Sequence, residues 1–458
     1  MTIKAGQVLR SLDPDTLVAI MRHPAQQETA ADIAELIGGL RKCKQPSDYY
    51  EFQRYLFGLV YEVEERRAQC SRIIKRLRRG GTLPADVPVP PHYGEPSKLE
   101  SWELEAYVYE RLARQLRTVG DGPAWRCFAY DRRVILALSR NFPAGPMYGK
   151  EGLPYELGRI MKLWENDHHF ALHHDLTNCL RIADLTEITD DGGRLLREIK
   201  AKPHTEKKQL ERAQAAVDAI MHGGPLPGDR PDARLVELTE PYVTNLKQLG
   251  DLLDLAKRHG CRGMKLSQGR ALVASSVPRV LQRWSQDFAE ANRVLDSARQ
   301  RAIVRAGIDT AVHHVKGFSS DTASRSPIMA PWSIYPFSPL DCAALICDLL
   351  VFETTVSAEA LVESLERAGL TGEVLLEPAD CQLDGDMGVV QAHWRDRSMI
   401  WHAFGLNLLL YELAEPDTLA RGMGETMRME NPPREPVMVY ANEASIWLPK
   451  LTRATAKA

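Results

Sequence analysis

The sequence of 458 residues lacks the patterns that most directly indicate a function. Its eight cysteines are scattered and form no CxxC pair, so neither a zinc ribbon nor a disulfide framework is indicated. No segment has the glycine spacing of a P-loop or of a GxGxxG fingerprint. The chain also has no internal repeat and no low-complexity tract. Free, buried thiols in a reducing compartment are therefore the expected state of the cysteines.

Long apolar runs and an excess of one charge are also missing. The longest apolar stretch, residues 342–352, is interrupted by Asp348 and is too short to span a bilayer. The net charge is −3 and the pI is near 6.5, so a nucleic-acid surface would have to be a local patch. Residues 1–6 have no apolar core of a signal peptide, and we expect a cytoplasmic protein without a membrane segment.

The composition is that of a globular protein, and prolines suggest where the chain divides. Hydrophobic residues make up 44% and charged residues 26%, which is ordinary for a chain long enough for two or three domains. Residues 82–96 contain five prolines and are predicted to form a stiff linker. We therefore predict a helical N-terminal domain with its linker (1–95), a central core (96–279) and a C-terminal mixed α/β domain of unknown role (280–458).

The most unusual local pattern is a predicted hairpin with charged residues on one face. Asp184 falls in a strand-like run, and Asp190-Asp191-Gly192-Gly193 follows it with residues that accept positive φ, which favours a tight turn. A second strand is predicted over residues 195–201. Side chains alternate along a strand, so Glu198 and Lys200 point to the same face, where Asp184 can meet them.

Two carboxylates and an amine on one sheet face are costly to bury without a partner. A divalent cation is a suitable partner, because Mg²⁺ takes one or two carboxylates and completes its shell with water and phosphate oxygens. A neighbouring lysine can position the attacking water or stabilise charge in the transition state. These groups predict hydrolysis of a phosphodiester. An ordinary exposed hairpin with Glu198 and Lys200 in solvent is the simpler alternative.

Asp184 followed by Glu198-Ile199-Lys200 on the next strand resembles the signature of the PD-(D/E)XK nuclease superfamily, although Ala183 stands where the name has proline. The resemblance implies an α/β protein with a restriction-endonuclease-like or RecB-like core, a small mixed sheet flanked by helices. It implies that Asp184 and Glu198 hold Mg²⁺ or Mn²⁺, with the Ile199 carbonyl as a third ligand. Lys200 would act on the attacking water.

The segment after the hairpin supplies further candidates. A helix predicted over residues 205–220 contains Gln209 and Gln214, and the resemblance implies that one of them orients the water or touches nucleic acid. Basic residues gather at the same place, namely Lys202, His204, Lys207 and Lys208. They would attract a polyanion, although acidic neighbours on the helix offset them if this surface is simply solvated. We expect DNA as the substrate because it is commoner in the family, and RNA stays open.

Other acidic and histidine residues compete for a place in this site. Family members often add one acid from the helix before the first core strand, predicted here over residues 153–166, and Glu156 is the candidate. We interpret it, with Glu103 and Glu110 on an earlier helix, as a solvated charge. His174 or Asp175 is expected at the rim of the cleft.

The run His173-His174-Asp175 also resembles the HD phosphohydrolases. That family places its His-Asp pair on a helix, whereas the residues before this run look strand-like, so we set this alternative aside.

The remaining segments are predicted in outline. The basic end of a helix over residues 47–79 is interpreted as a cation-rich helix terminus rather than a phosphate-binding arm. The apolar, proline-broken segment 328–337 is expected to be buried rather than to dock a partner. Residues 235–259 are predicted as a helix, 264–276 as an edge hairpin that completes the core sheet, and 401–413 as a helix.

Together these patterns predict a metal-dependent endonuclease of the kind found among effectors of prokaryotic antiviral defence. Its C-terminal domain would bind a protein partner, and the chain could form a homo-oligomer. The alternative is a non-catalytic interaction protein that uses a nuclease-like fold to bind a protein or a nucleic acid.

Overall fold

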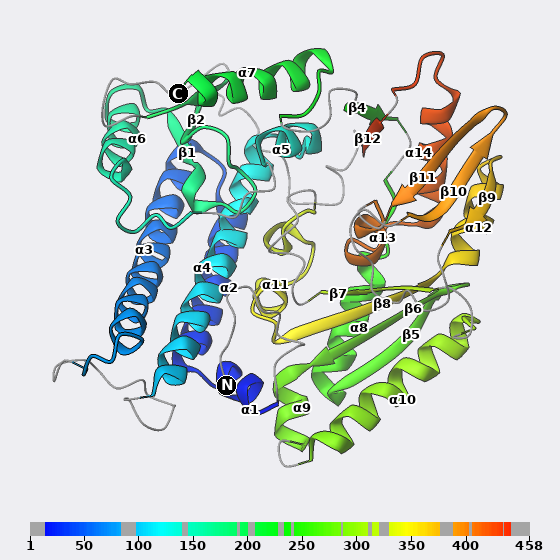
Figure 1. Ribbon diagram of the computed structural model, residues 1–458, viewed down its shortest axis with the longest axis horizontal. Coiled ribbons are helices and arrows are strands. Elements are labelled where there is room, and N and C mark those ends of the chain that lie inside the picture. Colours follow the sequence, from blue (N-terminus) through cyan, green and yellow to red (C-terminus); the bar gives the residue numbers. More distant parts are fainter. Residues whose placement is uncertain are drawn as a thin grey trace.

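The chain folds into a helical lobe and a sheet lobe that lie side by side (Figure 1). The helical lobe holds α1 to α7 and the first three strands, and the sheet lobe holds the later strands with their helices. The computed structural model describes residues 14–83, 98–139, 145–189, 193–199, 207–227, 233–239, 242–284, 287–309, 314–319, 329–375, 388–402, 405–433 and 435–440.

Long helices form the frame of the helical lobe. They are α1 (Pro14–Met21), α2 (Pro24–Lys42), α3 (Pro46–Leu77) and α4 (Leu99–Cys127). Proline stands at the first turn of α2 and α3, where its missing N–H costs no helical hydrogen bond. Helix α4 packs along both α2 and α3, so helices from both sides of the boundary expected at residues 95/96 share one bundle, and the boundary itself lies outside the described residues.

A small antiparallel sheet lies at one end of this bundle. Its strands, in the order β1-β2-β3, are β1 (Phe170–His173), β2 (Leu185–Ile188) and β3 (Arg194–Arg197). Helix α6 (Leu153–Asp167) and α3 pack against β1, and a short 3₁₀ turn, η2 (His174–Leu176), follows that strand. Helix α7 (Lys207–His222) packs on α5 (Arg132–Ser139). The predicted hairpin therefore exists, with Leu185 opposite Arg197, but its strands are shorter than predicted, and Asp184 and Glu198 lie directly outside them.

The sheet lobe is built on a separate antiparallel sheet of order β5-β6-β8-β7. Its strands are β5 (Cys261–Ser267), β6 (Arg270–Ser276), β7 (His314–Phe318) and β8 (Leu350–Ser357), with α8 (Leu246–His259) and α10 (Phe288–Ala306) packed on β5 and β6. The hairpin expected to complete the Asp184 sheet is β5-β6, and it pairs with β8 instead. The pairing of β6 with β8 crosses the boundary expected at residues 279/280. Which edge a strand joins depends on tertiary packing and not on its distance along the chain.

The rest of the sheet lobe adds two smaller sheets. One is the parallel pair β4 (Ala233–Leu238) and β12 (Glu435–Tyr440), and the other has the order β11-β10-β9. The remaining elements are α9 (Val277–Trp284), η3 (Trp332–Ile334), α11 (Pro339–Ile346), α12 (Ala358–Arg367), β9 (Thr371–Val374), β10 (Gly388–Trp394), β11 (Arg397–His402), α13 (Asn407–Tyr411) and α14 (Pro416–Arg428). Two predicted helices are thus wrong in part: residues 235–238 and 401–402 are strand, because their apolar runs are too short to separate the two periods.

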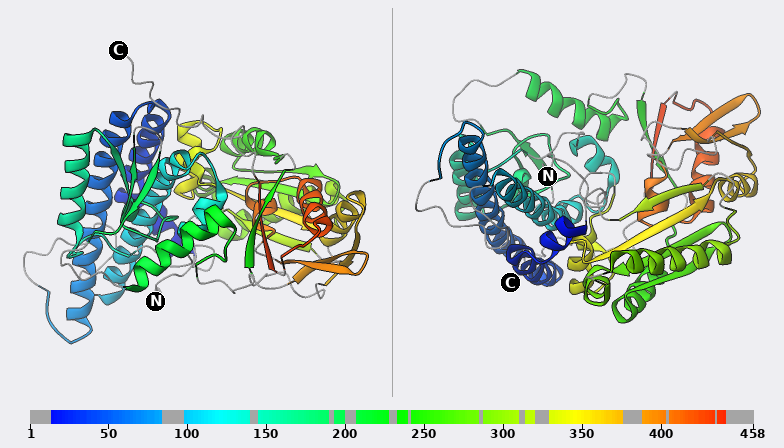
Figure 2. Two further views of the ribbon diagram at one scale, coloured as in Figure 1. Left: turned by 90° about the horizontal axis from the view of Figure 1, so that it is seen from above. Right: turned by 60° about the horizontal axis from the view of Figure 1, so that its bottom comes forward.

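The lobes share their largest hydrophobic core. It runs from Leu40 of α2 through Trp125 of α4 to Trp332 and Phe352 in the later half of the chain. Segment η3 and helix α11 pack on α4 and α2, so the apolar segment around Trp332 is buried, as predicted. Two further views show the same two-sided arrangement (Figure 2).

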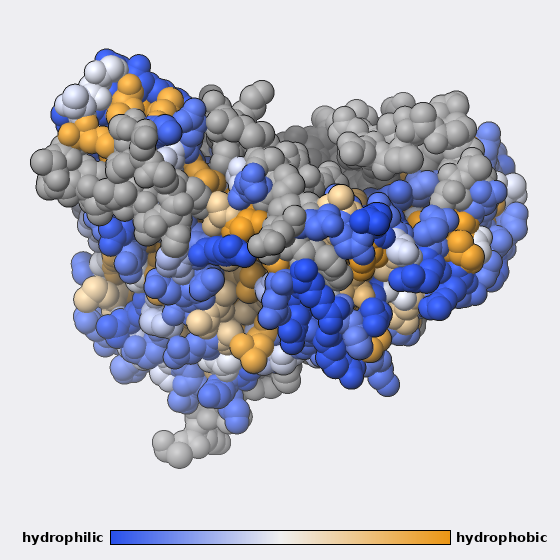
Figure 3. Space-filling view, turned by 90° about the horizontal axis from the view of Figure 1, so that it is seen from below, coloured by the Kyte–Doolittle hydropathy of each residue, from blue (hydrophilic) through white to orange (hydrophobic). Residues whose placement is uncertain are grey.

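The seven cysteines in the described part of the chain are all free and buried, as expected. No helix within the described ranges combines the length and the apolar character needed to cross a membrane. The face seen from below is mostly hydrophilic, and its hydrophobic residues form small separate groups (Figure 3).

Candidate functional site

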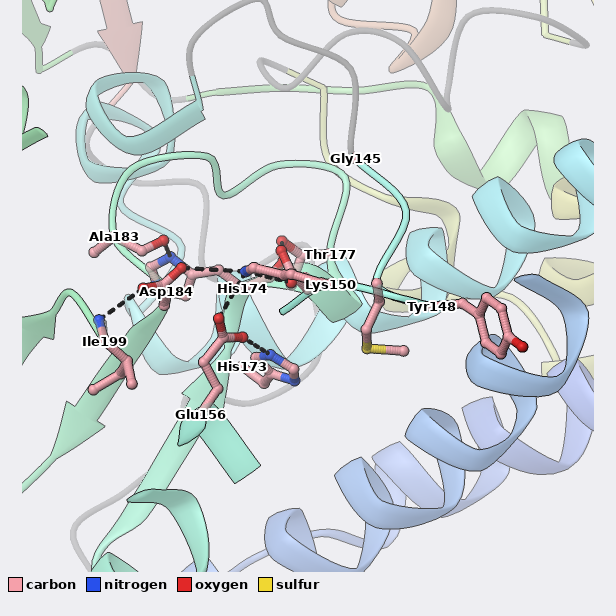
Figure 4. Close-up of polar contacts among 12 residues, drawn as sticks. Gly145, Tyr148, Lys150, Glu156, His173, His174, Thr177, Ala183, Asp184 and Ile199 are labelled. Atoms are coloured by element: carbon pink, nitrogen blue, oxygen red, sulfur yellow. Dashed lines mark hydrogen bonds and ion pairs between the residues drawn. The ribbon is translucent and has the colours of Figure 1, made fainter. Parts of the chain in front are cut away.

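Asp184 lies at the open end of the β2-β3 hairpin, directly before β2. Its backbone N–H donates to the carbonyl of Arg197 at 3.0 Å, which extends the strand pairing by one step. Its carboxylate Oδ2 accepts a hydrogen bond from the N–H of Ile199 at 2.7 Å. The structure therefore brings Asp184 to the segment after β3, where Glu198 and Ile199 follow the strand (Figure 4).

The other predicted site residues are only partly described. Glu198 is half-buried directly after β3, whereas Lys200 lies outside the described residues, as do Lys202 and His204. Gln209 is in α7, but its side chain is not among those described. Gln214 is exposed on α7 and donates to Asp218 of the same helix at 2.9 Å.

An ammonium group that the sequence analysis did not select joins this site. Lys150 precedes α6, and its Nζ lies 2.8 Å from Glu156, 2.8 Å from Asp175 and 3.3 Å from Asp184 (Figure 4). The three carboxylates come from α6, from η2 and from the residue before β2. One cation thus ties together three acidic groups that are distant in sequence.

Glu156 is the most buried of these acids, with 1% of its side chain exposed. The interpretation of Glu156 as a solvated charge is therefore wrong: it is on the inner face of α6, toward β1. Its Oε2 pairs with His173 Nε2 at 2.9 Å. Burial by itself would raise the pKa of Glu156, but the hydrogen bonds from His173 and Lys150 outweigh burial and lower it.

Asp175 and Lys150 stabilise each other's charged forms. Burial would raise the pKa of Asp175, but the nearby charges of His173 and Lys150 lower it. Burial would lower the pKa of Lys150, but its attraction to Asp175 and its hydrogen bonds to Asp175 and Glu156 raise it. Lys150 therefore stays an ammonium and cannot take up a proton at neutral pH.

His174 holds the backbone that presents Asp184. Its Nδ1–H donates to the carbonyl of Ala183 at 3.0 Å, and its own backbone N–H donates to the carbonyl of Asp184 at 3.0 Å. Ala183 has a left-handed conformation, with φ of 67°, which is strained for a residue with a Cβ. Burial lowers the pKa of His174 to about 3, so the ring is neutral and Nε2 accepts a hydrogen bond from Thr186 at 2.7 Å.

A buried ion pair fixes the backbone on either side of the site. Arg117 of α4 pairs with Glu64 of α3, and its guanidinium also donates to the carbonyls of Asp175 at 2.8 Å and Gly145 at 3.0 Å. Glu64 accepts from the N–H groups that precede Lys150, Met147 at 2.6 Å and Tyr148 at 2.8 Å. The position of the site therefore depends on the helical bundle.

Strand β1 is held from its outer edge by one side chain. Gln53 of α3 donates to the carbonyl of Ala171 at 2.9 Å and accepts from the N–H of His173 at 2.9 Å. Its amide thus takes the place of a neighbouring strand for one carbonyl and one N–H of this edge.

This donor set suits a hard cation. One ligand atom each from Glu156, His173 and Asp175 lie within 4.8 Å of one another. Two ligands on opposite sides of a cation are about 4.2 Å apart for Mg²⁺ and about 5 Å for Ca²⁺. Carboxylate oxygens are the ligands these ions prefer, and an imidazole extends the set to Mn²⁺.

The structure also bears on two other interpretations. His174 and Asp175 lie in a three-residue 3₁₀ turn, not in the α-helix that the HD phosphohydrolases require. At the basic end of α3, Arg78 pairs with Glu103 at 2.7 Å, whereas Arg72, Lys75, Arg76 and Arg79 are exposed. The choice between a helix terminus and a phosphate-binding arm therefore stays a prediction. Glu103 itself is buried, so the interpretation of this residue as a solvated charge is wrong.

Sequence reasoning missed Lys150 because nothing in Gly149-Lys150-Glu151-Gly152 distinguishes it from a surface turn. The only available signal was the chain position, a few residues before the helix of Glu156.

Comparison of the chain with models of protein families, with curated proteins and with solved structures finds no match.

Proposed function

We propose that this protein is a metal-dependent nuclease that hydrolyses phosphodiester bonds at the Asp184 site. The observation that carries the proposal is the convergence of Glu156, Asp175 and Asp184 on one cationic position at the end of the hairpin. Burial of several acidic side chains at one place is costly, because each charge needs a partner. A cation-binding role would account for their presence here.

The residues divide into those that hold a cation and one that positions the attacking water. Asp184, Glu198 and the Ile199 carbonyl would bind Mg²⁺ or Mn²⁺, with Glu156 and Asp175 beside them. A bound cation of this kind supplies a Lewis acid that lowers the pKa of coordinated water and balances charge on the phosphate. Lys200 remains the proposed group that positions the attacking water.

The described residues add two positioning roles to this scheme. His173 donates its Nε2–H to Glu156 and so orients the Glu156 carboxylate. His174 holds the Ala183 carbonyl and thereby the direction of Asp184. Because Lys150 remains protonated, it pairs with these carboxylates in the metal-free protein and does not abstract a proton.

Cleavage assays with matched variants test the proposal. Supercoiled plasmid, single-stranded DNA and single-stranded RNA are incubated with the full chain and Mg²⁺ or Mn²⁺, with EDTA as the metal-free control. Asp184→Asn keeps the shape but removes the charge, and Lys200→Met removes the ammonium. Glu165→Gln, on the exposed side of α6, is the matched control.

We expect divalent-dependent cleavage that Asp184→Asn and Lys200→Met each lower by about 10²-fold or more, as for other charge-stabilising groups in active sites. Glu165→Gln should cleave like the wild type. Cleavage that persists in EDTA or in Asp184→Asn would refute the site. Binding of nucleic acid with no cleavage under any of these conditions would favour the non-catalytic interaction protein.

A further inference from the structure

The position between the three carboxylates is already taken by a group of the chain itself. Lys150 Nζ is within 3.3 Å of an oxygen of Glu156, of Asp175 and of Asp184, and Figure 4 shows its side chain reaching toward Glu156 and Asp184. An ammonium has three hydrogens, so it can serve one hydrogen bond to each acid. A divalent cation bound to these oxygens would need the same space.

The charges at this position do not balance. Three carboxylates lie within 3.3 Å of a single ammonium, His173 is hydrogen-bonded to Glu156, and Arg117, whose charge also acts on Asp175, is itself paired with Glu64. A divalent cation would offset more of this negative charge than one ammonium does, and it would do so at shorter distances, about 2.1 Å for Mg²⁺. The carboxylates therefore favour exchange of the ammonium for such an ion.

Groups other than Lys150 hold the Glu156 and Asp184 carboxylates, whereas the side chain of Lys150 is partly exposed. Glu156 is held by His173, Asp184 by the N–H of Ile199, and the backbone of Asp175 by Arg117. Lys150 has 31% of its side chain exposed. It follows Gly149, which has φ of 79° and no atom within 4 Å of an added Cβ.

We propose that Lys150 competes with the divalent cation for the same position. The Lys150 ammonium occupies this position in the metal-free protein and must move out before the ion can bind. The inference rests on the proposed function, because Asp184 is a ligand of the cation in both, and here Glu156 and Asp175 beside it become ligands as well. It adds a device that keeps the acids paired, and the site closed to weakly bound ions, until the concentration of divalent cation is sufficient.

Calorimetric titration of the full chain with Mn²⁺ and Mg²⁺, without nucleic acid, tests this competition. Lys150→Met removes the ammonium and keeps the length of the stem, and Lys150→Arg restores a cation. Lys162→Met, at an exposed position of α6, is the matched control. We expect Lys150→Met to bind Mn²⁺ at least about tenfold more tightly than the wild type, and Lys150→Arg to bind near the wild-type value.

A second measurement uses the unaltered protein and so does not depend on how the variant folds. Acylation of Lys150 by an amine reagent, followed by mass spectrometry, should become faster when Mn²⁺ is added, while Lys162 should react at an unchanged rate. Equal or weaker Mn²⁺ affinity in a folded Lys150→Met, or unchanged Lys150 reactivity in saturating Mn²⁺, would overturn the inference. Failure of nuclease activity alone would refute the proposed function and leave this competition standing.

Discussion

Single side chains decide how Asp184 is presented. His174 is buried, neutral and bonded on both ring nitrogens, and it holds Ala183 in a conformation that an alanine rarely adopts. The local chain at residues 183–184 therefore depends on one imidazole and on the hydroxyl that accompanies it. Loss of either partner leaves a buried polar atom without a hydrogen bond.

At this scale we predict that Thr186→Val destabilises the protein. The hydroxyl of Thr186 is fully buried and donates to His174 Nε2, so its removal leaves that nitrogen unpaired at a cost of about 1–3 kcal/mol. The measurement is the free energy of unfolding from urea denaturation. Thr371→Val, on an exposed position of β9, should change it by no more than about 0.5 kcal/mol. Equal effects of the two variants would contradict this role of His174.

At the scale of elements, helix α4 positions the site through a residue that has no side chain. A Cβ added to Gly120 would lie 1.9 Å from the carbonyl oxygen of Leu176, which is backbone and cannot move aside cheaply. Leu176 ends the 3₁₀ turn that carries Asp175. The close approach of α4 to η2 thus requires glycine at this position.

We predict that Gly120→Ala displaces η2 and destabilises the protein by about 1–3 kcal/mol, since it overpacks a buried contact. Gly58→Ala is the matched control, because Gly58 is exposed on α3 and a Cβ there meets no atom within 4 Å. Alanine in that helix should raise the free energy of unfolding by up to about 1 kcal/mol. Thermal unfolding of both variants measures these changes in stability. If Gly120→Ala is as stable as the wild type, η2 does not need this contact.

The start of α3 provides a pH-dependent element. The Asp48 carboxylate accepts from the N–H groups of Lys44 at 2.8 Å and Gln45 at 3.2 Å. The hydrogen bond from Lys44 is the main cause that lowers the pKa of Asp48 below its ordinary 3.8. A lowered pKa in the folded state means that this stabilisation is present above pH 3.8 and is lost as the pH falls through the folded value.

We therefore predict that Asp48→Ala costs about 1 kcal/mol at pH 7, as expected for loss of a helix cap, and that the difference from the wild type shrinks toward pH 3. Urea denaturation at pH 7, 5 and 3 measures it. Asp251→Ala, exposed on α8, is the control and should show no such trend. A difference that grows on acidification would reverse the sign and disprove the assignment.

At the scale of the whole molecule, a buried ion pair joins the lobes. Arg132 of α5 binds both carboxylate oxygens of Glu412, at 3.1 and 3.0 Å, and neither side chain is exposed. Tyr242 and the N–H of Ala330 also donate to Glu412, at 2.6 and 2.7 Å. These contacts join four segments that are distant in the chain, so the ion pair connects the helical lobe to the sheet lobe.

Arg132→Met should lower the free energy of unfolding by about 3–5 kcal/mol, because it leaves Glu412 buried without its cation. Arg367→Met is the contrasting variant: Arg367 pairs with Asp417 at 2.7 Å, but both are well exposed, and the loss should not exceed about 1 kcal/mol. Denaturation followed by fluorescence and by circular dichroism gives both values. If the two variants lose the same stability, the Arg132 pair has no special part in holding the lobes together.

The sequence by itself determined the local elements of this protein. The turn residues after Ile188 and the strand-like runs on either side of them identify the Asp184 hairpin, because these signals act within a few residues. The burial of the segment around Trp332 also follows from local pattern, whereas the α/β class was implied by the family resemblance. The hairpin explains why Asp184 and the Glu198-Ile199 segment could be predicted as neighbours.

Only the tertiary structure decided which distant groups share a site and which strands share a sheet. Lys150 meets Glu156, Asp175 and Asp184 because α3 and α4 fix the segments that carry them, and no local pattern contains that information. For the same reason β5-β6 pairs with β8 rather than with β1-β3. Pairing and burial between remote segments depend on the shape and edges that the rest of the chain provides, whereas a turn or a helix start depends on its own residues.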